Sequence, residues 1–294
     1  MTTLHIADGA SVDIDAIAAA GFEIVDGRAD FSIASKIESG MARPKRTILM
    51  QPEPPVANCR ISLHGKHAQF LAVFTFQPTL PNEYPITTTA AYPYRPGLKF
   101  LDAGDIPKRT GRGIYFAGRC RNSPDGAHCG GYRQYNLRES IARGLRERLG
   151  GTCLGQGWEK STKKGWHENK RTEIAELCPD YVLALENCSM PNYVSEKLWD
   201  GMLSNRLTLY HGAPNVERLL PNAGYVNLRR WGAKTCPLDE VCEYLAAMTD
   251  EEYGDRVLLQ RATVIDRAGA WAGQRAKNTQ RIIEILTGAR DNAE

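Results

Sequence analysis

The sequence has none of the long apolar runs that mark membrane or exported proteins. No stretch of its 294 residues approaches the ~20 apolar residues that a membrane-spanning helix needs. The N-terminal segment MTTLHIADGASVDID has neither a basic start nor an apolar core, so it does not resemble a secretory signal. We therefore expect a cytoplasmic protein without a transmembrane segment, for which peripheral association with a membrane stays open.

A large excess of charge is also absent. The 37 lysines and arginines nearly balance the 34 aspartates and glutamates, and a net charge of +3 is too small to imply a nucleic-acid partner. Positive charge is concentrated only in residues 160–171, which can be a solvated loop or a basic rim over an anionic ligand. With 42% apolar and 24% charged residues, the chain has a globular composition and is long enough for two domains.

Metal-binding patterns are missing as well. The eight cysteines include no Cys-x-x-Cys pair and no spacing typical of zinc sites, so we expect reduced thiols and no cofactor. The acid-x-acid pattern Asp13-Ile14-Asp15 is a form that can hold a metal on a nucleotide diphosphate. It precedes an alanine-rich helix rather than ending a buried strand, so helix capping is the better interpretation.

Short apolar strands alternate with helices along the chain, which predicts an α/β fold with parallel sheets. In the first part, strands are expected at 21–25, 46–51 and 70–76, and a helix at 15–20. The proline-rich stretch 77–96 is predicted to be an extended connection without an element of its own.

The second part begins with a strand at 114–117 and a helix at 137–149, and the polar segment 155–171 is predicted to be irregular. Further strands are expected at 181–185, 206–210 and 225–228, and further helices at 195–203, 216–220, 238–248, 253–262 and 275–286. These patterns predict two Rossmann-like domains, over 1–108 and 109–270, and a final segment, 271–294, that can cross back to the first domain.

The most informative segment spans residues 180–199. Its apolar run Tyr181–Leu185 predicts a strand buried on both faces, and Glu186 and Asn187 follow at the carboxyl end, where open α/β sheets bind ligands. Asn192 or Ser195 can cap the helix that comes next. Because Lys197 then lies in its first turn, the helix start is suited to binding a phosphate or pyrophosphate.

Three motifs in this region resemble the donor-binding motif of the α-1,3/1,4-fucosyltransferases. They are Leu185-Glu186-Asn187, Tyr193-Val194-Ser195-Glu196-Lys197 and Gly212-Ala213-Pro214. The resemblance extends over roughly residues 112–235. It implies a GT-B fold, in which two Rossmann-like domains with parallel sheets face each other across a cleft, and a nucleotide-sugar donor, GDP-fucose.

The resemblance also implies a role for single residues. Lys197 and Arg138 would bind the diphosphate, with Arg119 or Arg121 as alternatives to Arg138 in an arginine-rich region. Glu196 would accept hydrogen bonds from ribose or sugar hydroxyls, or would only complement the helix dipole.

Further residues of the same motifs complete the expected site. Tyr193 and Asn187 would line the nucleotide pocket, together with Ser195, and Glu186 would either touch the ligand or hold the loop. The catalytic base implied by the resemblance is Glu53, which follows a predicted strand and has prolines on both sides that restrict its backbone.

Together these features predict an inverting, metal-independent transferase that moves fucose from GDP-fucose to a glycan hydroxyl, such as an α-1,3 position of N-acetylglucosamine or glucose in a bacterial surface polysaccharide. Two alternatives stay open. The same fold can use another nucleotide deoxysugar, or the chain can be a non-catalytic nucleotide-sugar-binding subunit of a polysaccharide assembly complex. The sequence departs from the family pattern at Cys188 and His211 and in its short N-terminal domain.

Overall fold

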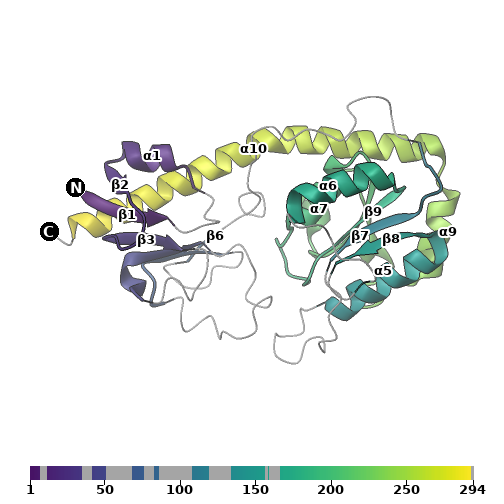
Figure 1. The fold of residues 1–294 in the computed structure, drawn as a ribbon, viewed down its shortest axis with the longest axis horizontal. Coiled ribbons are helices and arrows are strands. Elements are labelled where there is room, and N and C mark those ends of the chain that lie inside the picture. The colour runs from purple at the N-terminus through teal and green to yellow at the C-terminus, as the bar shows by residue number, and fades with distance from the viewer. Residues whose placement is uncertain are drawn as a thin grey trace. The chain divides into compact units, whose positions relative to one another are not determined.

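The chain folds as two α/β units, which are described separately (Figure 1). Unit 1 comprises Met1–Tyr94 and Ala268–Glu294, and unit 2 comprises Arg95–Arg267. The computed structural model describes residues 1–6, 12–34, 42–50, 68–75, 83–85, 108–118, 134–155, 158 and 166–292.

Unit 1 contains a parallel sheet that has six strands among the described residues. The strands are β1 (Thr2–Ile6), β2 (Phe22–Ile24), β3 (Phe31–Ala34), β4 (Thr47–Met50), β5 (Ala72–Thr75) and β6 (Glu83–Pro85), in the spatial order β2-β1-β3-β4-β5-β6. The helices are α1 (Ile14–Ala19), the short 3-10 helix η1 (Pro44–Arg46) and the C-terminal part of α10 (Asp250–Asp291). Leu4, Ile33 and Ile48 on neighbouring strands are fully buried, as expected for a sheet with a packed face.

Two sequence expectations for unit 1 have clear outcomes. Asp13 caps α1, because its carboxylate accepts a hydrogen bond of 3.1 Å from the backbone N–H of Ala16, so the capping interpretation is confirmed. The proline-rich stretch does contain an element, the short strand β6, where none was predicted. As β6 is the outermost strand of the order given above, Pro85 removes no hydrogen bond from the interior of the sheet.

Unit 2 contains a parallel sheet with five strands in the part of the chain that the structure describes. The strands are β7 (Ile114–Ala117), β8 (Gly151–Leu154), β9 (Tyr181–Leu185), β10 (Leu207–His211) and β11 (Val226–Asn227). Their spatial order is β11-β10-β9-β7-β8, which is a doubly wound arrangement. From β7 the sheet extends to β8 on one side and to β9, β10 and β11 on the other, so the strand order reverses between β7 and β9. Ligands bind such sheets at this switch point, beyond the carboxyl ends of the strands.

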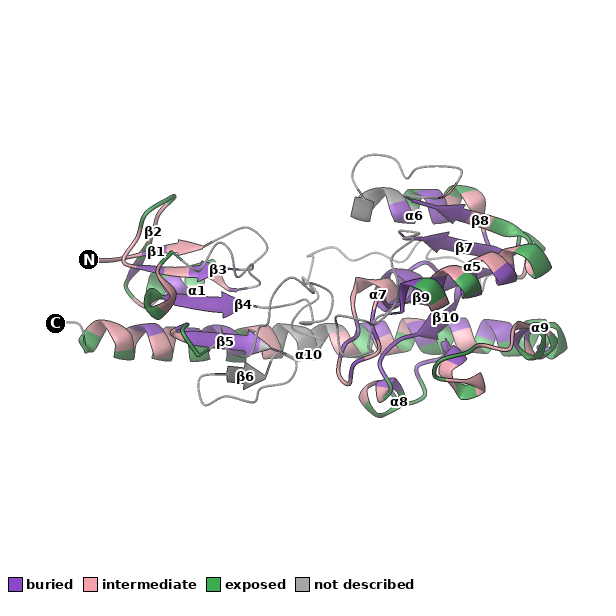
Figure 2. Cartoon of the chain, turned by 90° about the horizontal axis from the view of Figure 1, so that it is seen from below, coloured by how far each residue is buried: buried purple, intermediate pink, exposed green. Residues whose placement is uncertain are grey.

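Helices cover both faces of the second sheet. The α5 (Tyr135–Leu149) and α9 (Leu238–Ala247) helices pack on the face with Ile114, Phe116 and Leu183, whereas α6 (Trp166–Leu177) packs against Tyr115 and Val182 on the other. On that second face also lies α7 (Glu196–Leu203) (Figure 1). The strands β9 and β10 are therefore buried along their whole length (Figure 2). The described part of the unit also contains α8 (Val216–Leu219), the 3-10 helix η3 (Leu228–Trp231) and the N-terminal part of α10.

Two helix expectations are wrong. Residues 166–177 form α6, although the segment up to residue 171 was expected to be irregular. The C-terminal region forms one helix of 42 residues, α10, instead of the two helices predicted at 253–262 and 275–286. No proline follows Pro237, and a glycine inside a helix costs only about 1 kcal/mol, so Gly269 and Gly273 do not end α10.

Candidate functional site

The polar residues of the central motif gather at the switch point of the second sheet. Glu186 directly follows β9 and is fully buried, and its backbone N–H donates a hydrogen bond of 2.8 Å to the carbonyl of His211 at the end of β10. The loop after Glu186 leads to the N-terminus of α7, and α5 begins beside it. The site is thus built on the ends of packed strands and on helix starts.

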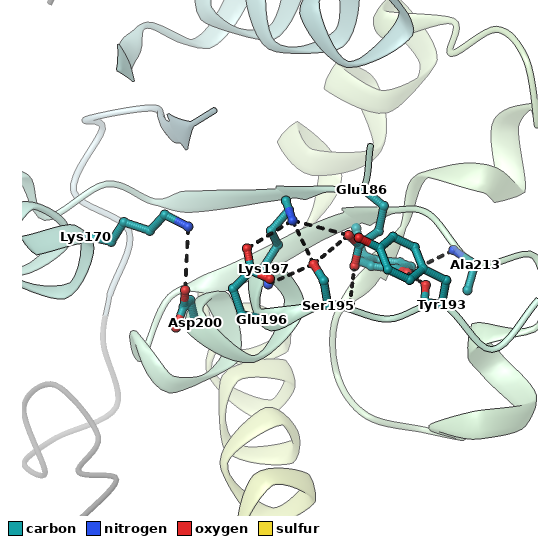
Figure 3. A network of polar contacts seen from close by, with 9 residues as sticks. Lys170, Glu186, Tyr193, Ser195, Glu196, Lys197, Asp200 and Ala213 are labelled. Carbon is teal, nitrogen blue, oxygen red and sulfur yellow. Dashed lines mark hydrogen bonds and ion pairs between the residues drawn. The ribbon is translucent and has the colours of Figure 1, made fainter. Parts of the chain in front are cut away.

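Glu186 and Ser195 hold the start of α7 in place. The Glu186 carboxylate accepts two hydrogen bonds from Ser195, 2.7 Å from its backbone nitrogen and 2.6 Å from its hydroxyl (Figure 3). The Ser195 hydroxyl in turn accepts the backbone N–H of Lys197, which makes Ser195 the N-cap of α7. Asn192, the other candidate cap, instead pairs with the side chain of Asn215.

The ammonium group of Lys197 lies among these residues. Its Nζ is 2.8 Å from the Ser195 hydroxyl, 3.0 Å from Glu196 Oε1 and 3.6 Å from Glu186 Oε2 (Figure 3). The side chain is 18% exposed, so the charge is largely withdrawn from bulk water yet still accessible. A lysine held at a helix N-terminus is an arrangement that binds phosphate groups.

The two glutamates of the motif are in different electrostatic environments. Burial raises the pKa of Glu186, and the positive charge of Lys197 opposes this shift. Burial also acts to raise the pKa of Glu196, but the charges of Lys197 and Lys170 outweigh it and lower that pKa to about 2. Glu196 is therefore ionised at neutral pH and can accept hydrogen bonds from hydroxyl groups.

Arg138 supplies a second, buried cation from the first turn of α5. The residue is 5% exposed, and its guanidinium lies 5.6 Å from the ring centre of Phe116 and 5.4 Å from that of Tyr135. Burial lowers its pKa, yet an arginine stays protonated. Its Nε is buried and has no hydrogen-bond partner within the described part of the chain.

Gly118, at the end of β7, makes room for this guanidinium. A Cβ atom at this position would lie 2.7 Å from the Arg138 guanidinium and 2.6 Å from the Phe116 ring. The carbonyl of Gly118 accepts a hydrogen bond of 3.1 Å from the indole of Trp158. Neither Gly118 nor Trp158 belongs to a motif that sequence reasoning selected, because their role depends on contacts between separate strands.

Two further residues that sequence reasoning missed tie the site together. Gln134 donates its backbone N–H to the carbonyl of Asn187 at 3.0 Å, and its side-chain oxygen lies 3.0 Å from Nδ1 of His211. Burial lowers the pKa of His211 to about 4, with a further contribution from the charge of Arg229. A neutral His211 therefore donates from Nδ1 to Gln134, since an amide oxygen can only accept.

The remaining residues of the predicted site are partly described by the structure. Tyr193 is buried, and its carbonyl accepts the hydroxyl of Tyr210 at 3.4 Å. The side-chain oxygen of Asn187 is buried without a hydrogen-bond partner among the described residues. Glu53, Arg119 and Arg121 lie outside the described residues.

Within the described ranges, no group of three or more histidine, cysteine, aspartate or glutamate side chains could hold a metal ion. The same ranges contain no helix that is both long and apolar enough to cross a bilayer.

Part of the chain matches a known protein family. Residues 128–255 match the family model described as glycosyltransferase family 10 (fucosyltransferase), C-terminal. An alpha-(1,4)-fucosyltransferase of Arabidopsis thaliana is 26% identical over 93 residues, which are 32% of this chain and 22% of that protein. The match thus spans less than a quarter of that relative's length.

Solved structures resemble the chain over most of its length. An alpha1,3-fucosyltransferase with GDP-fucose has a TM-score of 0.55 at 13% identity, covering 87% of this chain and 81% of that one. The alpha1,3-fucosyltransferase with GDP gives a TM-score of 0.53 at 13% identity over the same shares. At such low identity these matches establish the fold.

The two parallel sheets and the likeness to solved structures define a fold of the GT-B class, so the predicted α/β fold class is confirmed. The resemblance to the fucosyltransferases is confirmed as well: residues 128–255, less than half of the chain, match the fucosyltransferase C-terminal family model, and a curated alpha-(1,4)-fucosyltransferase matches over 93 residues.

Proposed function

We propose that this protein transfers fucose from GDP-fucose to a hydroxyl group of a glycan, without a metal ion. The observation that carries the proposal is the convergence of Lys197 and Arg138 on the switch point of a sheet in the family-10 domain. A nucleoside diphosphate leaving group needs such cations, because negative charge builds up on it as the glycosidic bond breaks. GDP and GDP-fucose are the ligands named for the structural neighbours.

The leaving group is stabilised by fixed charges in this proposal. Lys197 and Arg138 donate charge-assisted hydrogen bonds to the diphosphate, each contributing about 1.5–3 kcal/mol. The dipole of α7, whose N-terminus lies beside these residues, adds to the attraction. Glu196 accepts hydrogen bonds from ribose or fucose hydroxyls, which its ionised state supports. Tyr193, Asn187 and Ser195 complete the donor pocket.

The acceptor hydroxyl is deprotonated by Glu53 in this proposal. Direct attack of that oxygen on the anomeric carbon inverts its configuration, because the new bond forms opposite the departing diphosphate. Replacing Glu53 with glutamine should lower turnover by ~10²–10⁴-fold and leave the affinity for GDP nearly unchanged. An N-acetylglucosamine or glucose unit of a bacterial polysaccharide is the acceptor we propose, and the cytoplasm is the proposed location.

Calorimetric titration tests the donor site directly. The purified protein, with EDTA present, is titrated with GDP, UDP and dTDP, and then with GDP-fucose. We expect binding of GDP in preference to the pyrimidine diphosphates, and at least tenfold weaker binding in Lys197→Ala. Preference for UDP or dTDP would point to another nucleotide deoxysugar. GDP binding without any transfer activity that depends on Glu53 would favour the non-catalytic subunit. The absence of any nucleotide binding would overturn the proposed donor site.

A further inference from the structure

Lys170 is a buried charge that the proposed reaction does not use. It lies on α6 and is only 5% exposed. Its Nζ is 3.7 Å from Oδ2 of Asp200 on α7, and both side chains are less than 8% exposed (Figure 3). Burying such a pair is costly and adds little net stability on its own, so its presence calls for another explanation.

The pair lies next to the diphosphate-binding lysine. Asp200 and Glu196 are four residues apart on α7 and therefore share a face of the helix. A small, partly open pocket of about 20 Å³ is lined by Lys170, Lys197 and Asp200 together with Tyr115 and other side chains, and it has room for about one water molecule. Lys170 and Lys197 thus line the same pocket between α6, α7 and the sheet.

Among the described residues, the cations of this region do not outnumber the carboxylates. The cations are Arg138, Lys170 and Lys197, and the carboxylates are Glu186, Glu196, Asp200 and, on α6, the buried Glu173, which accepts the hydroxyl of Tyr115 at 2.8 Å. If Lys170 were neutral, Lys197 would have to balance Glu196 and Asp200 as well as Glu186. Those carboxylates would then compete with an anionic ligand for the same ammonium group.

We propose that Lys170 is a positioning residue of the donor site. Its buried charge balances Asp200 and Glu196, so that the charge of Lys197 is available to a nucleoside diphosphate. This inference rests on the proposed function, because it assigns Lys170 to that same donor site. It acts through the carboxylates of α7 and requires no contact between Lys170 and the ligand.

The pKa values of the cluster agree with this arrangement. Burial lowers the pKa of Lys170, and the charges of Asp200 and Glu196 oppose that shift. Lys197 and Arg138, the other cations near Lys170, lower it further. The carboxylates of α7 and the two lysines thus stabilise each other's charged forms.

The test compares GDP affinity in four variants by calorimetry. Lys170→Met should weaken GDP binding by at least about fivefold. The GDP affinity of Lys170→Arg and of the double variant Lys170→Met/Asp200→Asn should stay within about twofold of that of the unmodified protein. Each of these variants leaves the net charge of the cluster unchanged. Lys234→Met, at an exposed lysine of unit 2, is the matched control and should leave affinity unchanged.

A second measurement needs no ligand. The carboxyl carbon of Glu196, assigned with Glu196→Gln, is titrated by NMR in the unmodified protein and in Lys170→Met. We expect the pKa of Glu196 to rise in the variant, since one of the two lysines that lower it is lost. Should Lys170→Met fail to fold, Asp200→Asn provides the test, and it should bind GDP at least as tightly as the unmodified protein.

The outcomes separate the two proposals. If the unmodified protein binds no nucleotide, the proposed function fails, and the donor-site role of Lys170 fails with it. If GDP binds normally but Lys170→Met shows unchanged affinity, only the role of Lys170 is overturned. The same holds if the double variant does not recover affinity, or if the pKa of Glu196 does not move.

Discussion

At the scale of single residues, close packing limits what the site tolerates. Gly212 follows β10 and stands where a side chain would collide with the Tyr210 hydroxyl and with the Glu186 side chain. The Tyr210 hydroxyl also accepts the backbone N–H of Ala213 at 2.9 Å, which fixes the turn after β10. The Gly-x-Pro motif therefore has a steric reason, which is the close approach of this turn to Glu186.

Gly212→Ala should accordingly destabilise the protein by about 1–3 kcal/mol, because overpacking forces neighbouring groups to move. Since Glu186 moves with the turn, GDP affinity should fall as well. Denaturant unfolding and calorimetry measure the two effects. Unchanged values for both would contradict the steric argument.

Ser195 joins the helix cap to the ligand site. Ser195→Ala removes the cap of α7 and the hydroxyl that contacts Lys197, so we expect about 1 kcal/mol lower stability and weaker GDP binding. Ser195→Thr retains the hydroxyl and is the matched control. If the two variants behave alike in urea unfolding and in GDP titration, the hydroxyl has no such role.

His211 should make stability depend on pH. Its folded-state pKa of about 4 lies below the ordinary value of 6.5, so below pH 6.5 the unfolded chain binds a proton that the folded protein does not. The contribution of His211 to the free energy of unfolding is fully present above pH 6.5, and it falls by up to about 3 kcal/mol as the pH drops towards 4. His211→Asn should remove that part of the decline, measured by urea unfolding at several pH values. An identical pH profile in the variant would show that His211 is not responsible.

At the scale of elements, some helices and strands are evident from the local sequence, whereas others depend on tertiary contacts. The strands β7, β9 and β10 and the helix α5 were predictable because their apolar runs or periodicity are long. The helix α6 was not, since its sequence WHENKRTEIAEL is mostly polar and its packing depends on Ile174 against Tyr115 and Val182. The strands β1, β3, β6 and β8 were also missed, because their short sequences include polar residues, glycine or proline and their pairing is defined by neighbours in the sheet.

The long helix α10 gives a prediction at this scale. Gly273 lies in its interior and is exposed, and a Cβ atom at this position would have no neighbouring atom within 4 Å. Gly273→Ala should therefore stabilise the protein, by up to about 1 kcal/mol, since alanine has the higher helix propensity. Thermal or urea unfolding measures the gain. A loss of stability would mean that α10 is not a continuous helix at this point.

At the scale of the whole molecule, the described donor-site residues all belong to unit 2. GDP at a hundred times its dissociation constant should stabilise the state that binds it by about 2.7 kcal/mol. Hydrogen exchange of the amides in β9 and β10 should therefore slow down with GDP, whereas exchange in β1 and β2 of unit 1 should change little. Equal protection of both sheets would place part of the GDP site in unit 1.

Local sequence was enough to establish the α/β class, the family resemblance and the central motif, because each follows from residues close together in the chain. The family motifs also singled out Arg138 and Lys197 as candidates for diphosphate binding. The tertiary structure was needed to bring Gln134 to His211, which is 77 residues away, and Lys170 to Asp200. Such pairs depend on which strands are neighbours and which helices share a face of the sheet, and burial then decides how strongly their charges act on each other.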